Sequence, residues 1–225
     1  MKGIDGKVAV VTGGGKAIGR SIALALAARG VRIVVTGREE RAIGETVGEI
    51  AYGGGKARHL AGDVRDAAHL SAVFERAHEV FGGLDFVIAD ASEADGDELA
   101  RAEALLSTNL MDVYCTFDAA ARRMKGPGRL LAVSPAPRFG VPGYAARCAS
   151  HAGIVGLARA VAHELAAKAI TANVLVPTAA ESGPGVGRAI EPEEVADLAV
   201  YLCSSAADAV TGQVISVGGV PPFEM

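Results

Sequence analysis

The stretch VAVVTGGGKAIG, residues 8–19, decides the fold. Its first four residues are apolar without alternation, which is typical of a central parallel strand covered on both faces. After the glycine turn, residues 20–29 carry the apolar spacing of a helix that ends at Gly30. A glycine turn between a strand and a helix places free N–H groups and the positive end of the helix dipole where a pyrophosphate can bind. The alternative is that the turn is only a tight connection.

Strands and helices continue to alternate to the end of the chain. Strands separated by helices are expected to lie parallel and to be joined by right-handed crossovers. The predicted fold class is therefore α/β, a doubly wound parallel sheet of about seven strands with helices on both faces. No segment rich in Pro, Ser or charge marks a boundary, which predicts a single domain over residues 1–225. Further strands are expected at 32–36, up to 63, 84–89, 129–134, 171–176 and 213–217, and helices at 39–51, 66–81, 103–124, 144–168 and 191–205.

The charge balance argues against several classes of partner. The 225 residues include 22 basic and 26 acidic side chains, a formal net charge of −4, which leaves no basic excess for binding nucleic acid. No apolar stretch approaches the roughly 20 residues of a membrane-spanning helix. Asp5 and Lys7 interrupt any secretory signal at the N-terminus. We therefore expect a cytoplasmic protein that binds neither nucleic acid nor membrane.

Cysteine and histidine spacing gives no sign of a metal site. The three cysteines form no CxxC pair, and the five histidines show no close ligand spacing. The sequence therefore predicts buried free thiols and no metal. A mean hydropathy of +0.31 is high for a soluble domain and hints at apolar surface buried between subunits.

Several motifs together resemble the short-chain dehydrogenase/reductase family over nearly the whole chain. The resemblance implies a single Rossmann domain, a nicotinamide cofactor and usually a tetramer built partly through two long helices. The matching stretches are TGGGKAIGR at 12–20, AGDV at 61–64, TNL at 108–110, GRLLAVS at 128–134, ASHAGIVGLARAVAHELA at 149–166, ITANVLVP at 170–177, EPEEVADLAVYLCSSAA at 191–207 and TGQVISVGG at 211–219.

The resemblance also assigns the cofactor-binding residues. In the family, an acid at the end of the second strand holds the adenine ribose hydroxyls, whereas an arginine nearby receives a 2′-phosphate. This chain has Gly37 and Arg38 there, with Lys16 in the glycine loop, so NADP(H) is favoured if a dinucleotide binds. The alternative is that both cations are ordinary solvated charges. The full assignment is Gly13, Gly15, Lys16, Ile18, Gly19, Arg38, Asp63 and Val64, the last two resembling the family's adenine contact.

The catalytic positions of the family are only partly kept. Its members use a tyrosine proton donor, a lysine four residues later, a serine and an asparagine. Alignment by the Pro-Gly at 142–143 and the Ala-Gly at 152–153 places Arg147 at the tyrosine position and His151 at the lysine position. Because arginine stays protonated at ordinary pH, it cannot cycle a proton to an alkoxide.

Other side chains offer partial replacements. Tyr144 lies three residues before the expected donor, so its use would need a different substrate pose. His151 could act as an acid or base near neutral pH, although a neighbouring guanidinium would disfavour its charged form, and the plainer interpretation, which we prefer, is a histidine packed in a helix face. Ser134 matches the family serine when counted back from Arg147, whereas counting from Gly128 reaches the next residue. Asn109 fits the family asparagine and is otherwise a hydrogen-bonding group at a helix kink.

Three further departures from the family lie around the expected groove. The family's Asn-Asn-Ala-Gly is Ala-Asp-Ala-Ser at 89–92, which adds Asp90, a charge that would repel phosphates if it faced them. Ala17 replaces the second glycine of the cofactor loop, and its methyl group narrows the approach to a pyrophosphate. The segment at 178–190 is a shortened substrate lid. Cofactor binding is therefore expected to be weakened or lost.

These observations leave three functions open. The first is a non-catalytic member that supports an active relative in a mixed oligomer, within the general expectation of a homo- or hetero-oligomer of subunits of this family. The second is an NADP(H)-dependent reductase of a small carbonyl, or a dehydrogenase of an alcohol, with His151 or a water held by Asn109 as proton source. The third is an anion-binding or sensor protein in which Arg147 and His151 meet a carboxylate. Hydrolysis by Ser134 and His151 lacks an identified orienting acid.

Overall fold

A computed structural model describes residues 3–91, 102–103, 105–134, 143–178, 188 and 190–218. Its centre is a seven-stranded sheet in the order β3-β2-β1-β4-β5-β6-β7, and every pair of neighbouring strands is parallel. The strands are β1 (Val8–Thr12), β2 (Arg32–Gly37), β3 (Ala57–Ala61), β4 (Phe86–Asp90), β5 (Gly128–Val133), β6 (Ile170–Pro177) and β7 (Val214–Val217). This sheet confirms the predicted doubly wound α/β fold.

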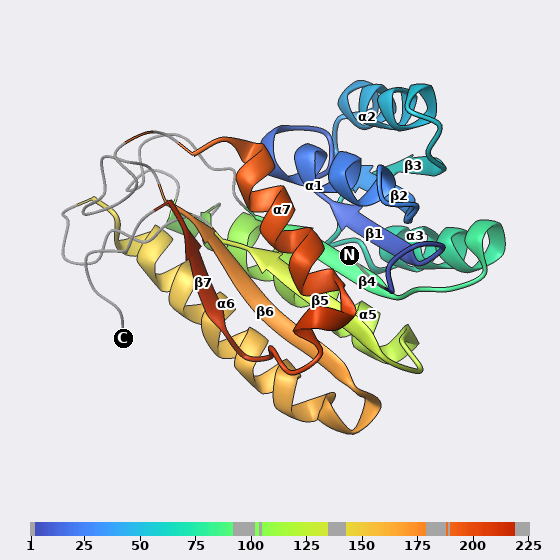
Figure 1. The fold of residues 1–225 in the computed structure, drawn as a ribbon. Helices are drawn as coiled ribbons and strands as arrows, with labels where there is room; N and C mark the ends of the chain where they lie inside the picture. The colour runs from blue at the N-terminus through green and yellow to red at the C-terminus, as the bar shows by residue number, and fades with distance from the viewer. Residues whose placement is uncertain are drawn as a thin grey trace.

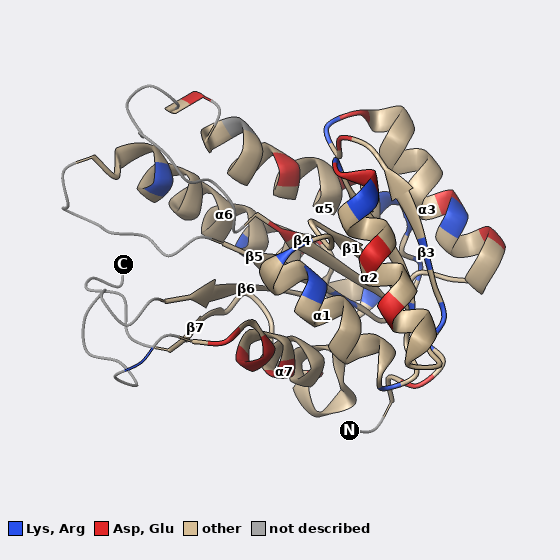
Figure 2. Cartoon of the chain, turned by 90° about the horizontal axis from the view of Figure 1, so that it is seen from above, with Lys and Arg blue, Asp and Glu red and all other residues tan. Residues whose placement is uncertain are grey.

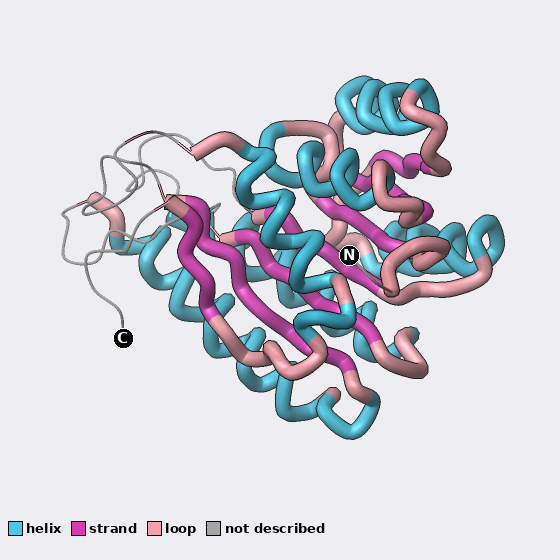
Figure 3. Tube along the Cα trace, in the orientation of Figure 1, coloured by secondary structure: helices cyan, strands magenta, loops and turns pink. Residues whose placement is uncertain are grey.

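Helices cover both faces of the sheet. Figure 1 shows α1 and α7 in front of it and α3, α5 and α6 behind it, and Figure 3 shows the same layers with the strands in magenta between helices in cyan. The helices are α1 (Ala17–Ala27), α2 (Glu40–Tyr52), α3 (Ala67–Phe81), α5 (Asp112–Arg123), α6 (Ala145–Glu164) and α7 (Pro192–Cys203), with shorter turns η1 (Ser107–Met111), η2 (Ala166–Lys168) and η4 (Ser205–Ala207).

Two apolar cores result from this arrangement, one on each face. On one face, Ile22 of α1 and Val200 of α7 pack with α2 against the odd-numbered side chains of β1. On the other, Phe74 of α3, Phe117 of α5 and Ile154 of α6 pack against the remaining strand residues. Because β1 and β4 are buried on both faces, their sequences are apolar without alternation.

Two of the differences between predicted and observed helix boundaries bear on the site. Helix α1 begins at Ala17, three residues before the predicted start, because the last part of the glycine loop already forms the first turn. The helix predicted over 103–124 is found in its described residues, but it contains a π-helical turn that the sequence did not predict, η1 at Ser107–Met111, directly before α5. Such a turn fits one extra residue into the helix and is frequent at functional sites. Asp66, the first residue of the helix predicted over 66–81, caps α3 by accepting a hydrogen bond from the Ala68 N–H.

The strand order creates the crevice in which the site lies. The chain winds outward from β1 through β2 to β3, then returns to β4 on the other side of β1. The connections therefore diverge above the carboxyl ends of β1 and β4, where ligands bind in open α/β sheets. The three cysteines are free, as predicted, but only Cys203 is buried, whereas buried thiols were expected at all three. Across the described ranges, no helix has the length and apolar character needed to cross a bilayer.

Candidate functional site

A cavity opens above the carboxyl ends of β1, β2 and β4. Most of the cofactor-binding residues predicted from the sequence line it, whereas Ile18 and Gly19 are not among its lining residues. Figure 2 shows basic and acidic positions interleaved where α1, α2 and α5 meet these strand ends. The lining residues are Thr12, Gly13, Gly15, Lys16, Gly37, Arg38, Glu39, Ala42, Ile43, Gly62, Asp63, Val64, Asp90, Ala91, Thr108 and Asp112.

The glycine loop is packed too closely for side chains at its glycines. Thr12 of β1 lies opposite Ala89 of β4, so the next residues, Gly13 and Asp90, meet directly. A Cβ at Gly13 would lie 2.9 Å from the Asp90 carbonyl oxygen, and the φ of Gly13 is +68°. A Cβ at Gly19 would lie 2.6 Å from the Gly13 carbonyl oxygen. Ala17 has a φ of +42°, a left-handed conformation that glycine adopts more readily.

The basic side chain of this loop is neutralised within the chain. The Lys16 ammonium forms an ion pair and a hydrogen bond with the Glu39 carboxylate, just beyond the end of β2. Arg38, the other predicted phosphate ligand, lines the same cavity, and its guanidinium makes no hydrogen bond or ion pair in the described part of the chain. The sequence prediction that this strand end has no acid overlooked Glu39, which directly follows Arg38.

Two more carboxylates lie at the adenine end predicted for the groove. Asp63 accepts hydrogen bonds from the Arg65 backbone N–H at 2.9 Å and from its guanidinium Nε at 3.0 Å, and the hydrogen bonding by the Arg65 side chain lowers the pKa of Asp63 to about 2. Arg65 Nε also lies 3.6 Å from Asp112 Oδ1. That oxygen is buried without a hydrogen-bond partner, and burial raises the pKa of Asp112 to about 6. Arg65 and Asp112 were missed from the sequence.

The carboxylate of Asp90 points into the glycine loop. Asp90 Oδ2 accepts a hydrogen bond of 2.8 Å from the Gly19 N–H, in the first turn of α1. The charge expected beside the cofactor groove therefore does face the helix terminus that would bind a phosphate. Its position follows from the register of β1 and β4, which brings the residue after Ala89 against the glycine loop.

The positions that match the family's serine and lysine are in contact. Ser134 follows β5 and His151 lies on α6, and Ser134 Oγ is 2.9 Å from His151 Nδ1. Ser134 is fully buried and His151 is 6% exposed. Burial lowers the pKa of His151 to about 4, so the imidazole is neutral at physiological pH. Of the two alignments of the serine, only Ser134 falls within the described residues.

The asparagine position lies beside this pair but bonds elsewhere. Asn109 is buried in η1, and its Nδ2 donates a hydrogen bond of 3.4 Å to Ser150 Oγ on α6. Ser150 in turn donates to the Arg147 carbonyl oxygen at 2.9 Å. Asn109 Oδ1 is buried without a hydrogen-bond partner. A polar atom without a partner in such a place is costly unless a water or ligand meets it.

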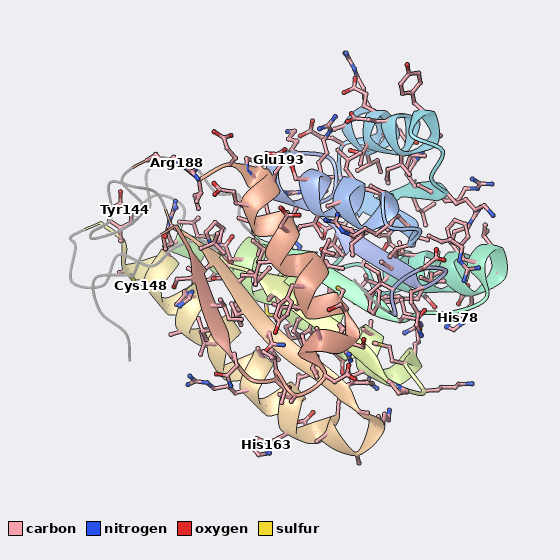
Figure 4. The ribbon with its side chains drawn as sticks, viewed as in Figure 1. His78, Tyr144, Cys148, His163, Arg188 and Glu193 are labelled. Atoms are coloured by element: carbon pink, nitrogen blue, oxygen red, sulfur yellow. The ribbon has the colours of Figure 1, made fainter. Side chains whose placement is uncertain are left out.

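The residue at the proton-donor position is directed to the end of its helix. The Arg147 guanidinium carbon lies 5.8 Å from the centre of the Tyr144 ring, a cation–π contact. Tyr144 is the residue before the first turn of α6, and Figure 4 shows it at that end of the helix together with Cys148. The Tyr144 phenol therefore lies at the start of α6, and not on the later turn that carries His151.

The rest of the predicted site is described only in part. Thr178 and Ile190, the ends of the predicted lid, are described, and so is Arg188, which pairs with Glu194 through both guanidinium nitrogens, at 2.6 and 2.7 Å. Residues 179–187 and 189 lie outside the described residues. No group of three or more His, Cys, Asp or Glu side chains in the described part could hold a metal ion.

Comparisons with known proteins agree with this geometry. Residues 13–219 match a family model described as enoyl-(acyl carrier protein) reductase. The chain is 30% identical over 239 residues to the 3-oxoacyl-[acyl-carrier-protein] reductase FabG of Escherichia coli, covering 96% of this chain and 97% of that protein. It is also 30% identical over 244 residues to the D-threitol dehydrogenase of Mycolicibacterium smegmatis, covering 96% and 93%.

Solved structures give the same picture. A short-chain type dehydrogenase/reductase from Mycobacterium marinum superimposes with a TM-score of 0.88 at 29% identity, covering 95% of this chain and 94% of that one. An actinorhodin polyketide ketoreductase variant, solved with NADPH, superimposes with a TM-score of 0.86 at 27% identity, covering 97% and 98%.

Proposed function

The chain belongs to the short-chain dehydrogenase/reductase family of oxidoreductases, and on this premise we propose that it is a non-catalytic member. Its role would be to support an active relative within a mixed oligomer. NADP(H) is the cofactor to which its sequence points, bound weakly if it is bound. The side chains at the catalytic positions of the family support this role, because they lack its usual proton donor.

The observation that carries the proposal is the pair of substitutions on α6. Arg147 holds its proton at any ordinary pH, so it cannot act as the acid that a phenol would be. His151 is neutral near pH 7, because burial lowers its pKa to about 4, and its Nδ1 is bonded to Ser134. Loss of general acid–base help alone typically costs about 10²–10⁴ in rate.

The surfaces that would serve assembly are kept. Leu106, Met111 and Tyr114 expose 36%, 42% and 47% of their surface on the segment formed by η1 and α5. Large apolar side chains gathered on one segment are more typical of a subunit interface than of free surface. Helix α6 and the β7 region also keep the family's sequence motifs, which supports an assembly role for a chain whose reacting positions have changed.

Purification from the native host tests the proposal. We expect the chain to co-elute with a second family member that carries tyrosine and lysine at the positions of Arg147 and His151. Tyr114→Glu should then lower the yield of the mixed complex at least about tenfold, since it buries a charge in the interface. Tyr52→Glu is the matched control, because Tyr52 is 95% exposed on α2. A strictly lone homo-oligomer would contradict the proposal.

The contact between Ser134 and His151 favours a second candidate, an active reductase of a small carbonyl. In it, Ser134 would donate its proton to the reacting oxygen and take one from the imidazolium form of His151, which would recover its proton from solvent. Turnover of NADPH by the pure chain, lost in Ser134→Ala and His151→Asn, would establish this function. The absence of turnover at millimolar cofactor would remove it.

A further inference from the structure

The cavity can be tested against the dinucleotide that the fold implies. Part of the cradle fits: the glycine loop leaves no room for side chains, and the N–H groups of Ala17 and Ile18 have no hydrogen-bond partner within the described ranges. A helix N-terminus of this kind attracts anions. The charges around it decide whether a pyrophosphate can use that attraction.

Asp90 places a carboxylate at the same helix terminus. Its Oδ2 lies 2.8 Å from the Gly19 nitrogen, and its backbone packs against Gly13. The positive end of a helix dipole is equivalent to about half an elementary charge. The full negative charge of the Asp90 carboxylate, within hydrogen-bond distance of this terminus, therefore outweighs the attraction of the α1 dipole for a phosphate.

Glu39 removes the second source of attraction. Its carboxylate is paired with the Lys16 ammonium, the cation of the glycine loop. A phosphate approaching this loop would have to compete with Glu39 for Lys16, or bind while Glu39 remains close by. Because Glu39 directly follows Arg38, the same carboxylate also lies next to the predicted ligand of a 2′-phosphate.

The summed charge of the lining points the same way. Among the described residues that line the cavity are four acids, Glu39, Asp63, Asp90 and Asp112, and two basic residues, Lys16 and Arg38, so these six side chains carry a formal charge of 2 − 4 = −2. Arg65, which approaches Asp63 and Asp112, reduces this excess but does not cancel it. A dinucleotide adds at least two further negative charges, and like charges at close range repel more strongly in a partly buried site than in water. The residues present do not fit NADP(H).

We propose that the chain's own carboxylates, Asp90 at the first turn of α1 and Glu39 on Lys16, stand where the cofactor's phosphates would bind and close the groove to dinucleotides. The phosphate-binding positions are thus occupied by negative charge from within the chain, and we expect the chain to fold without a cofactor. This inference goes beyond the proposed function, because it concerns the isolated chain and holds whether or not a second subunit binds.

Isosteric substitutions that remove these charges test the inference, because they should increase the affinity of the chain for NADPH. Asp90→Asn keeps an oxygen that accepts the Gly19 N–H and removes only the charge, and Glu39→Gln does the same beside Lys16. Titration of the pure chain with NADPH, followed by nicotinamide fluorescence and calorimetry, should show no saturation at millimolar cofactor for the native sequence. Each variant should bind at least about tenfold more tightly, and the double variant about a hundredfold, if the two repulsions are independent.

The controls change the same charges elsewhere on the chain. Asp197→Asn removes an exposed acid of α7 that pairs with Arg29, and Glu49→Gln removes one of α2 that pairs with Arg20. Both should leave NADPH binding unchanged. Added salt should strengthen the weak binding by the native chain, because it screens a repulsion, and should weaken binding by the double variant.

Two results would overturn the inference. One is micromolar NADPH binding by the native chain. The other is a double variant that melts as a folded protein and binds no better than its controls. Neither result affects the proposal of a mixed oligomer, which is tested by purification without cofactor. Each proposal can therefore be refuted independently of the other.

Discussion

The two ends of the groove have changed in different ways. At the nucleotide end, formed by β1, β2 and α1, the glycine loop is kept and the charges around it are reversed or paired. At the proton-transfer end, formed by β5, η1 and α6, the described side chains at the matched serine and lysine positions are uncharged near pH 7. There, Ser134 and His151 form a buried, neutral hydrogen-bonded pair.

The difference separates two kinds of function. Phosphate binding depends on backbone geometry, which the fold itself preserves, and a few charges suffice to cancel it. Proton transfer depends on one titratable side chain, and an intact backbone cannot take over its role. A chain can therefore keep the family's architecture at both ends while losing a different requirement at each.

The largest effect is expected when both ends are restored together. Arg147→Tyr with His151→Lys returns the family's donor and its partner, but we expect little turnover while the nucleotide end repels the cofactor. Adding Asp90→Asn and Glu39→Gln should raise reduction of an unhindered 1,2-diketone by about a hundredfold at low cofactor concentration, the gain in NADPH affinity expected for the two charges, measured as loss of NADPH absorbance.

The arms of this experiment identify which end limits activity. Full activity in the α6 double variant alone would show that the nucleotide end works as it stands. A folded, cofactor-binding quadruple variant without turnover would instead place the larger defect in the segment at 178–190.

The sequence predicted the backbone of this site better than its contacts. Residues 8–19 are enough to predict the strand, the loop and the helix, because those depend on local apolar spacing and glycine. The substitutions at Arg147 and His151 are also visible in the sequence. The contact of His151 with Ser134 is not, since it joins α6 to β5 across the fold.

The charges that close the nucleotide end were predicted only in part. Asp90 was singled out because it replaces an asparagine of a known motif. Glu39, Arg65 and Asp112 belong to no motif, and only the packing of α2 and α5 over the strand ends brings them to one cavity. The π-helical turn inside the helix predicted over 103–124 was missed for a related reason, because apolar spacing does not reveal one extra residue in a turn.

Stability should also depend more on backbone at the nucleotide end. Gly13→Ala combines a left-handed φ with a Cβ 2.9 Å from the Asp90 carbonyl oxygen, and should lower the free energy of unfolding by about 2–4 kcal/mol. Ser134→Ala leaves His151 Nδ1 without its hydrogen bond, at a cost of about 1–3 kcal/mol. Urea unfolding of both variants measures the difference, and equal stability of Gly13→Ala and the native chain would refute the close packing of the loop.

The two ends should respond to pH with opposite signs. Burial lowers the pKa of His151 from 6.5 to about 4, so the unfolded chain takes up the proton first, and stability is lost as pH falls from 6.5 towards 4. Burial raises the pKa of Asp112 from 3.8 to about 6, so the folded chain holds that proton more tightly. Its contribution is fully present below 3.8 and is lost as pH rises through 6.

Non-titrating variants separate these two contributions. His151→Asn, which can still bond to Ser134, should remove about 1–2 kcal/mol of the loss towards acid pH. Asp112→Asn should be more stable than the native chain by about 1 kcal/mol above pH 7 and equal to it near pH 4. Urea midpoints across this range provide the measurement. If the stability of both variants relative to the native chain changed with pH in the same direction, the opposite contributions of His151 and Asp112 would be contradicted.

The smallest effect concerns the one strained alanine of the glycine loop. Ala17 has a φ of +42°, where a side chain costs roughly 1–2 kcal/mol, whereas glycine avoids that cost and loses more entropy on folding. Ala17→Gly should therefore raise the free energy of unfolding by about 0.5–1 kcal/mol, seen as a higher urea midpoint. Ala25→Gly, within α1, is the control and should lower it by about 1 kcal/mol. Equal destabilisation by both substitutions would contradict the strain at Ala17. The loop would then be an ordinary helix start and not a strained phosphate-binding loop.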